Sequence, residues 1–239
     1  MISRRTFLAI TGGMLLSPKV FGADAAPKVP EMLDHILLGC GDLDQGIAFV
    51  EQHTGVRPAI GGVHPGRGTR NALLSLGKLH YLEVIAPDPA QVGTKISRES
   101  MINALKALSA PRIFEWAVHT NDITGVAERL RQARIAFSGP TPGSRKRPDG
   151  QVLNWQTLNL DDDQGGLLPF FIQWSADSIH PSVDAPSGCR LESFAVANFH
   201  HSDLAAMFRK LEIEVDVEKT EKPHIFALIV GPRGRLDLR

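Results

Sequence analysis

A histidine and a glutamate on two separate predicted strands are the residues with the clearest potential for chemistry. His35 lies in the apolar run 33–38, and Glu83 lies in the run 80–86. Imidazole and carboxylate groups are common ligands of divalent metals, so the pair predicts the start of a metal site. A buried His–Glu pair without a metal is the alternative. By strand alternation, the neighbours that share the face of each residue are Leu33 and Leu37, and Tyr81 and Ile85.

Two further ligands depend on how a second, similar segment is aligned with the first. Gln173 takes the place of Glu83 in that segment. Counting back from the helix starts puts Glu115 in the place of His35, whereas matching the local triplets puts Trp116 there. The first register gives four metal ligands: His35, Glu83, Glu115 and Gln173. In the second, Trp116 would stack on a ligand, and both registers stay open. The expected ion is Zn, Ni, Mn or Fe.

A glycine-rich segment, residues 64–71, carries a second set of reactive side chains. His64 is a candidate general acid or base, and Arg67 can hold an anionic substrate. Thr69 and Asn71 add neutral hydrogen-bonding groups for substrate. The segment lacks the Gly-Lys-Ser/Thr ending of a phosphate-binding loop, so no nucleotide is expected. A bulged hairpin with solvated arginines is the alternative.

Aromatic side chains provide candidate walls for a small-molecule pocket. Tyr81, Trp155 and Trp174 are expected to contact substrate, as is Trp116 in the second register. Most buried aromatic residues belong to a core, so only some of these are expected in the pocket.

Repeated βαβββ units are the elements that must position these groups. The first covers residues 33–87, with strands at 33–38, 71–76 and 80–86, a short strand within 58–70 and a helix at 42–54. The second covers 113–175, with strands at 113–120, 151–160 and 167–174, a helix at 122–134 and an exposed loop at 139–150. The third covers 191–239 and has a short helix that Ser202 caps and that ends at Leu211.

Such units work in pairs, and two curved sheets then enclose a pocket. The fold class is therefore α+β, with paired βαβββ modules and a third βαβββ-like module. The third unit either packs on the pair or finds its twin in a second chain, which would make a homodimer. A linker with a helix at 98–108 joins the first two units.

The N-terminal residues 1–25 have the pattern of a twin-arginine signal peptide. Ser3-Arg4-Arg5 is followed by Phe7 and Leu8, and residues 23–25 fit a signal-peptidase site. The pattern predicts a bacterial protein exported to the periplasm or beyond, through the export machinery. The segment carries a net charge of +2, which leaves the remaining chain near −2.

Bulk composition excludes some functions. The 26 basic and 26 acidic residues balance, so no nucleic-acid partner is expected, and no apolar run is long enough for a stable membrane span. Cys40 and Cys189 either pair in an oxidising compartment or stay as small buried residues, and the second interpretation is favoured.

Taken as a group, these motifs resemble the glyoxalase-like domain proteins of the vicinal oxygen chelate superfamily. The resemblance covers residues 32–181 strongly and the third unit weakly, and it implies paired βαβββ modules. In the superfamily it implies a divalent metal that chelates vicinal oxygens of a substrate. The motifs are Leu33-Asp34-His35, the segment 64–71, Tyr81-Leu82-Glu83, Pro169 to Trp174 and His180-Pro181-Ser182.

The chain departs from the catalytic members of that superfamily at two points. Gln173 stands where they carry a carboxylate that is often the general base, and Gln cannot accept a proton in that way. Extradiol dioxygenases need a second histidine, which is missing at the matched strand.

Two functions follow as hypotheses. The first is a metal-dependent lyase or isomerase acting on a small carbonyl compound or 2-oxo acid, with His64 as acid or base and Arg67 on the substrate. The second is a metal-free periplasmic protein that binds or sequesters a small molecule.

Overall fold

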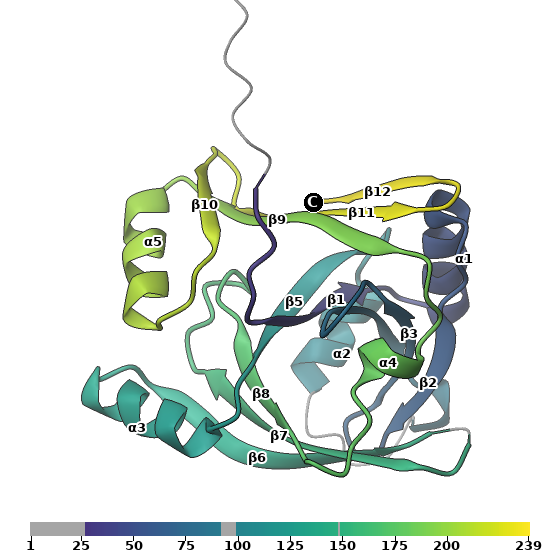
Figure 1. The fold of residues 1–239 in the computed structure, drawn as a ribbon, viewed down its shortest axis with the longest axis horizontal. Helices are drawn as coiled ribbons and strands as arrows, with labels where there is room; N and C mark the ends of the chain where they lie inside the picture. The colour runs from purple at the N-terminus through teal and green to yellow at the C-terminus, as the bar shows by residue number, and fades with distance from the viewer. Residues whose placement is uncertain (1–26, 92–98, 148) are drawn as a thin grey trace, which may run out of the picture.

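Two βαβββ units pair edge to edge in one strongly curved sheet of eight strands (Figure 1). The structure is a computed structural model that describes residues 27–91, 99–147 and 149–239. The strand order is β2-β3-β4-β1-β5-β8-β7-β6, with β1 and β5 antiparallel at the centre. The elements of the first unit are β1 (Leu33–Gly39), α1 (Leu43–Thr54), β2 (Ala59–His64), β3 (Thr69–Ser75) and β4 (Tyr81–Pro87). Those of the second are β5 (Arg112–His119), α3 (Ile123–Gln132), β6 (Phe137–Lys146), β7 (Val152–Leu160) and β8 (Phe170–Trp174).

Three short helices lie outside this repeat. They are η1 (Pro89–Gln91), α2 (Glu99–Lys106) and α4 (Pro181–Asp184), and α2 confirms the helix predicted in the linker. No helix in the described ranges is long and apolar enough to cross a membrane. The predicted signal peptide, residues 1–25, falls outside the described residues and stays a prediction.

An aspartate caps each of the first two long helices, at the residue where the sequence predicts the helix to begin. The side chain of Asp42 accepts a hydrogen bond from the backbone N–H of Gln45 (2.9 Å), and Asp122 accepts one from Gly125 (2.8 Å). The expected cap at Ser202 is wrong. Helix α5 (His201–Lys210) has its N-cap two residues earlier, at His200, whose side chain makes no capping hydrogen bond.

The third unit has the predicted order of elements but different strand pairing. Strands β9 (Arg190–Asn198), β10 (Asp216–Lys219), β11 (His224–Gly231) and β12 (Gly234–Leu238) form a separate sheet in the order β10-β9-β11-β12. In the first unit, the parallel neighbour of β1 is the last strand, β4. In the third, the parallel neighbour of β9 is β10, because the chain returns beside β9 directly after α5. The order of elements confirms the third βαβββ-like module, and its strands pair in a different order from those of the first two units.

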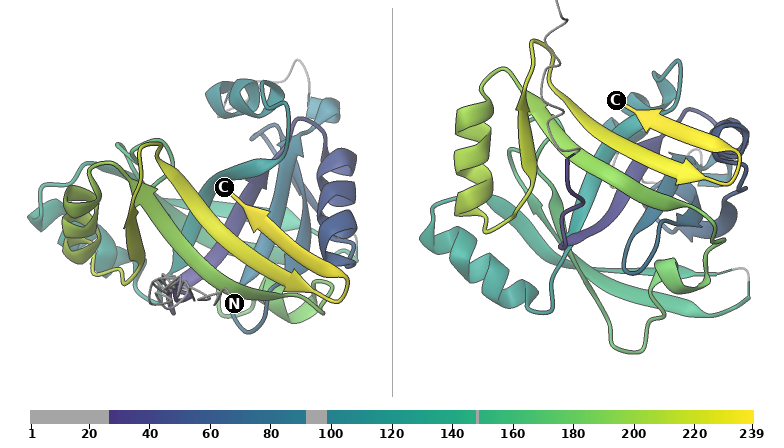
Figure 2. Two further views of the ribbon diagram at one scale, coloured as in Figure 1. Left: turned by 90° about the horizontal axis from the view of Figure 1, so that it is seen from above. Right: turned by 45° about the horizontal axis from the view of Figure 1, so that its top comes forward.

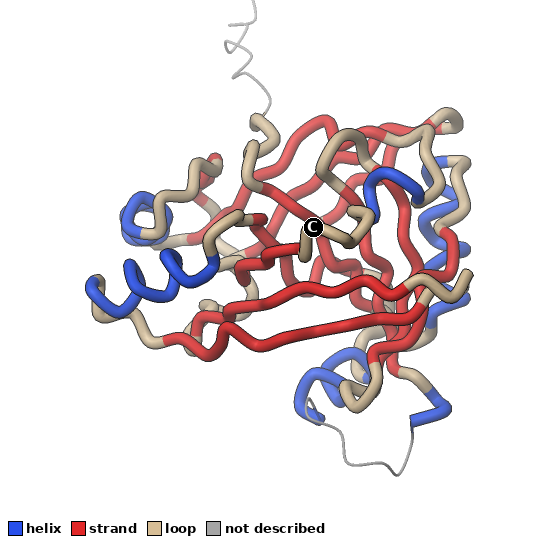
Figure 3. The backbone as a smooth tube through the Cα atoms, turned by 60° about the horizontal axis from the view of Figure 1, so that its bottom comes forward, coloured by secondary structure: helices blue, strands red, loops and turns tan. Residues whose placement is uncertain are grey.

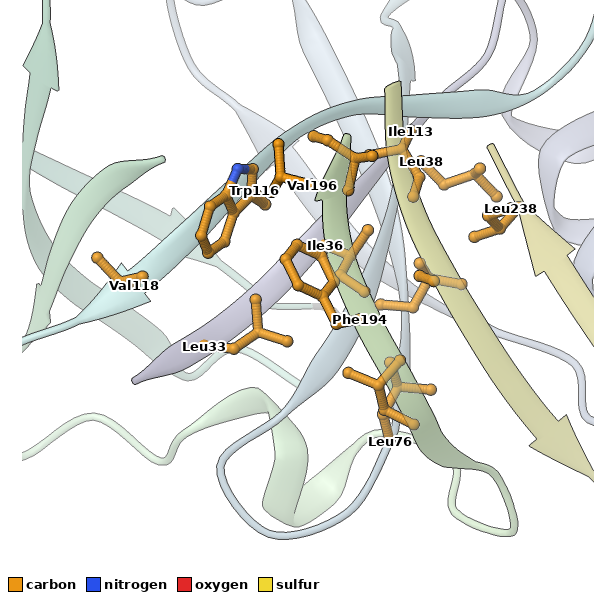
Figure 4. Packing of buried hydrophobic residues seen from close by; sticks show 14 of the residues in the cluster. Leu33, Ile36, Leu38, Leu76, Ile113, Trp116, Val118, Phe194, Val196 and Leu238 are labelled. Carbon is orange, nitrogen blue, oxygen red and sulfur yellow. The ribbon is translucent and has the colours of Figure 1, made fainter. Parts of the chain in front are cut away.

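This second sheet packs on the pair of modules within the same chain (Figure 2). The ring centroid of Trp116 on β5 lies 4.9 Å from that of Phe194 on β9 and 6.0 Å from that of Phe208 on α5. Leu33 and Ile36 of β1 belong to the same buried cluster (Figure 4). The third unit thus covers one face of the eight-stranded sheet and leaves the other face for a pocket.

The predicted loop at 139–150 is wrong over most of its length. Residues Phe137–Lys146 form the edge strand β6, which pairs with β7 in a long hairpin after α3 (Figure 3). Pro140 and Pro142 favour a loop, because proline lacks the N–H that a strand inside a sheet must donate. Proline is tolerated in β6 because β6 is an edge strand. A βαβββ unit requires three strands after its helix, so the sequence already indicated one more strand between α3 and β7.

Both cysteines are buried and free, as the sequence analysis favoured. Burial raises the pKa of the Cys40 thiol to about 12, with the charge of Asp42 as a further cause. Cys40 is therefore protonated and unreactive at neutral pH in the folded protein.

Replacing Trp116 with alanine is expected to lower the free energy of unfolding by about 3–5 kcal/mol, because it empties the contact between the two sheets. Phe199→Ala, at an aromatic residue 56% exposed on the same third unit, is the control and is expected to cost less than about 0.5 kcal/mol. Urea unfolding followed by circular dichroism measures both. Equal losses of unfolding free energy in the two variants, or a separate early unfolding transition of the four-stranded sheet, would contradict the shared core.

Candidate active site

A small pocket, with a cavity volume of about 70 Å³ and partly open to solvent, lies on the face of the curved sheet opposite the third unit. It takes residues from strands of both modules. Its lining includes most of the polar residues selected from the sequence and four aromatic side chains. The polar lining groups are His35, His64, Arg67, Thr69, Asn71, Glu83, Glu115, Arg145 and Thr157, and the aromatic ones are Tyr81, Trp155, Phe170 and Trp174.

A bulge in β1 turns His35 toward the pocket. The pairing of β1 with β5 shifts between Leu33 and His35, so Leu33 packs in the core while His35 and Leu37 face the pocket. The expectation that all three share a face is therefore wrong for Leu33. The ring of His35 stacks on Tyr81 of β4, with centroids 4.5 Å apart and planes 18° apart.

Asp34, the extra residue at the bulge, holds His35 from behind. Its Oδ1 lies 2.6 Å from His35 Nδ1, and its Oδ2 lies 3.2 Å from His180 Nε2 and accepts a hydrogen bond from Trp174 Nε1 (3.1 Å). Burial alone would raise the pKa of Asp34, but the hydrogen bonds with His180 and His35 outweigh it and bring the pKa far below its usual range. Asp34 is therefore ionised, and it fixes the orientation of the imidazole of His35.

Glu83 is a buried carboxylate with histidines on both sides. Its Oε2 lies 3.5 Å from His35 Nε2, its Oε1 lies 3.8 Å from His64 Nε2, and Asn71 Nδ2 donates to Oε1 at 2.8 Å. Burial pushes its pKa up, but the charges of His64 and His35, the amide of Asn71 and the charge of Arg145 together lower it below the usual value. The pocket therefore contains an ionised carboxylate largely shielded from water.

The glycine-rich segment aims His64 at Glu83. It forms the turn between β2 and β3, in which Gly66 and Gly68 take positive φ angles of 68° and 75°. Thr69 Oγ1 lies 2.8 Å from His64 Nδ1, which leaves His64 Nε2 directed at Asn71 (3.4 Å) and Glu83.

Arg145 is a pocket residue that the sequence analysis did not select, because it predicts an exposed loop in this segment. Its side chain is buried and lines the pocket, and its Nη1 donates a 2.7 Å hydrogen bond to Asn71 Oδ1. Gly61 and Gly62 on β2 make room for it, since a Cβ at Gly61 would lie 2.1 Å from Nη1. Burial lowers the pKa of the guanidinium, and the charge of Glu83 opposes that shift.

Two residues selected from the sequence lie outside the pocket. Trp116 is fully buried in the core on the opposite face, and its Nε1 donates to the carbonyl of Leu167 (3.0 Å), so it cannot stack on a ligand. Gln173 also points away, and its Oε1 accepts from the backbone N–H of Ile123 at the start of α3 (2.8 Å). Glu115, by contrast, lines the pocket, as the first register placed it. His180, which the sequence analysis names only as part of a motif of the family resemblance, supports Asp34.

The described residues do not complete the predicted metal site. A divalent ion needs several donors that converge on one point, and no three His, Cys, Asp or Glu side chains do so in the described ranges. Asn71 already donates to one oxygen of Glu83, and Ile172 of β8 faces the pocket where Gln173 was expected. The buried cation close to Glu83 is the guanidinium of Arg145.

The paired modules and the pocket between them define a protein of the vicinal oxygen chelate superfamily. A model of the glyoxalase-like domain family matches residues 33–216, and the chain belongs to that family. The match extends into the third unit, as far as the first residue of β10.

Solved structures with a similar fold include a hypothetical protein from Staphylococcus aureus. It is 20% identical, with a TM-score of 0.59, over 87% of this chain and 85% of that one. Methylmalonyl-CoA epimerase from Mycobacterium tuberculosis is 22% identical, with a TM-score of 0.42, over 62% of this chain and 89% of its own. The Streptomyces coelicolor epimerase, bound to 2-nitronate-propionyl-CoA, is 20% identical, with a TM-score of 0.46, over 62% and 100%. A search of the curated proteins found no match to this chain.

Asp34→Asn is expected to destabilise the protein by about 3 kcal/mol at pH 7, because it leaves His35 and His180 without their carboxylate. The pKa of Asp34 is lower in the folded than in the unfolded protein, so its contribution is complete above the ordinary value of about 3.9 and fades as pH falls further. Urea unfolding at several pH values measures the difference in unfolding free energy between wild type and Asp34→Asn. This difference should become smaller only below about pH 4. The exposed Asp177→Asn is the control. A difference that is absent at pH 7, or that widens in acid, would refute the assignment.

Proposed function

We propose that this chain is an isomerase-type enzyme that moves a proton on a small oxygenated substrate. The observation that carries the proposal is the ionised, buried Glu83 between His35 and His64 at the pocket. A general base must be deprotonated and within reach of the substrate, and the lowered pKa keeps Glu83 ionised at the pocket. General bases give about 10²–10⁴-fold acceleration.

In the proposed reaction, Glu83 takes a proton from a carbon next to a carbonyl or carboxyl group. The electron pair of that C–H bond moves onto the substrate oxygen, so Glu83 becomes neutral and the substrate becomes an enolate. The nearby Arg145 supplies positive potential for the new charge. His64 is the second proton carrier, because its Nε2 points at the same place from the other side.

His35 acts on Glu83 rather than on the substrate in this scheme. The buried Asp34 fixes its ring, and its Nε2 faces Glu83 Oε2 at 3.5 Å. It therefore keeps Glu83 oriented and ionised, as second-sphere carboxylate–histidine pairs do in other sites.

A binding protein without catalysis is the second candidate, and the aromatic walls favour it. Trp155 and Trp174 lie with ring centroids 5.5 Å apart at the pocket, and Phe170 packs against His35 with centroids 5.5 Å apart. Such surfaces hold flat, apolar molecules well. The two candidates differ in whether a bound molecule exchanges a carbon-bound proton.

Glu83→Gln is expected to reduce proton exchange by about 10²–10⁴-fold, because an amide cannot accept the proton. The assay follows loss of C–H signals by NMR in D₂O, over 2-oxo acids and carboxylic acids that carry a proton beside the carbonyl or carboxyl group. Glu192→Gln, at an exposed position of β9 in the four-stranded sheet, is the matched control and should keep the wild-type rate.

Two results would contradict the proposal. One is exchange by the Glu83→Gln protein at the wild-type rate. The other is the absence of exchange by the wild-type protein on every compound of the panel that it binds, which would favour the binding protein.

A further inference from the structure

Arg145 is a buried cation that forms no ion pair with the described residues, although the charge of Glu83 is near enough to act on it. Its side chain is only 3% exposed, yet no carboxylate oxygen of residues 27–91, 99–147 and 149–239 lies within ion-pair distance of its guanidinium. Asp184, close by, pairs with Arg147 instead. Buried charges in proteins are normally paired, because desolvation of an isolated charge costs several kcal/mol. A ligand is the natural source of the missing charge.

The surroundings of Arg145 are built to hold the guanidinium at the pocket. Gly61 and Gly62 leave the space that the side chain crosses, and a Cβ at Gly62 would lie 3.2 Å from its Cγ. Asn71 Oδ1 accepts from Nη1 at 2.7 Å, and the same Asn71 donates to Glu83. One amide therefore fixes the cation and the proposed base relative to each other.

An aromatic ring lies on the same side of the β6–β7 hairpin. Gly143, two residues before Arg145 on β6 and so on the same face, is covered by Trp155, since a Cβ there would lie 2.5 Å from the indole nitrogen. A molecule held by the guanidinium would therefore have the indole of Trp155 beside its body.

We propose that Arg145 binds the carboxylate of the substrate, and that the substrate class is small carboxylic acids with a flat or apolar body. This inference rests on the proposed function and deepens it by naming the charged group that the site recognises. The planar fork of arginine matches a carboxylate with two parallel hydrogen bonds. Held there, the acid places its neighbouring carbon near Glu83, on the other side of Asn71.

The test compares two isosteric probes, phenylacetate and its neutral amide phenylacetamide, by titration calorimetry and by quenching of the pocket tryptophans. Butyrate and butyramide form a second, smaller pair, which is used in case the pocket is too narrow for a phenyl ring. Wild-type protein should bind the acid of at least one pair about tenfold more tightly than the amide. Arg145→Gln should abolish this preference, Arg145→Lys should keep part of it, and the matched control Arg147→Gln should keep all of it.

Equal binding of acid and amide, binding of neither pair, or an unchanged preference in a folded Arg145→Gln protein would overturn the proposal. If Arg145 only stabilises the fold, Arg145→Gln lowers the melting temperature and leaves the preference for acid over amide intact. If Arg145→Gln does not fold, Arg145→Lys still decides, because loss of the bidentate geometry must weaken the acid and not the amide. Glu83→Gln separates the two proposals: it should keep acid binding while proton exchange is lost.

Discussion

The structure depends on keeping two carboxylates charged inside a curved sheet. Asp34 and Glu83 are both buried, and burial by itself favours their neutral forms. Each stays ionised because specific donors surround it, and those donors come from both modules. The pairing of the modules is therefore an electrostatic requirement of the pocket as well as a way to bury apolar surface.

The four-stranded sheet of the third unit makes this arrangement possible, because it buries the apolar face of the eight-stranded sheet. It covers the face of β1 and β5 that carries Trp116, so the apolar core and the polar pocket lie on opposite sides of the same two strands. The bulge at Asp34 separates them within a single strand. Leu33 goes to the core, His35 goes to the pocket, and Asp34 links the pocket to the chain around His180.

Periodic patterns made much of the fold and part of the site predictable from the sequence. The two aspartate-capped helices and the face shared by Tyr81 and Glu83 follow from local rules of capping and alternation. The alignment of β8 with β4 failed by one residue, and a shift of one residue in a strand reverses every side chain. Gln173 therefore points away, and Ile172 lines the pocket.

Arg145 could not be found from local pattern, because its strand contains two prolines and two glycines and has no apolar alternation. Its role comes from closure of the sheet, which brings β6 against the glycines of β2. His180 belongs to the same class: it acts through a contact with Asp34 that spans 146 residues of sequence. Contacts of that range depend on the whole topology.

The central claim is that the charges at work in this pocket belong to the protein itself, with Glu83 as base and Arg145 as cation. Elemental analysis of protein purified without chelator or tag-derived metal tests it most directly. The account predicts much less than one equivalent of Zn, Ni, Mn or Fe, and unchanged ligand binding after dialysis against a chelator. About one equivalent of a divalent metal, lost in His35→Ala and Glu83→Ala, would contradict it.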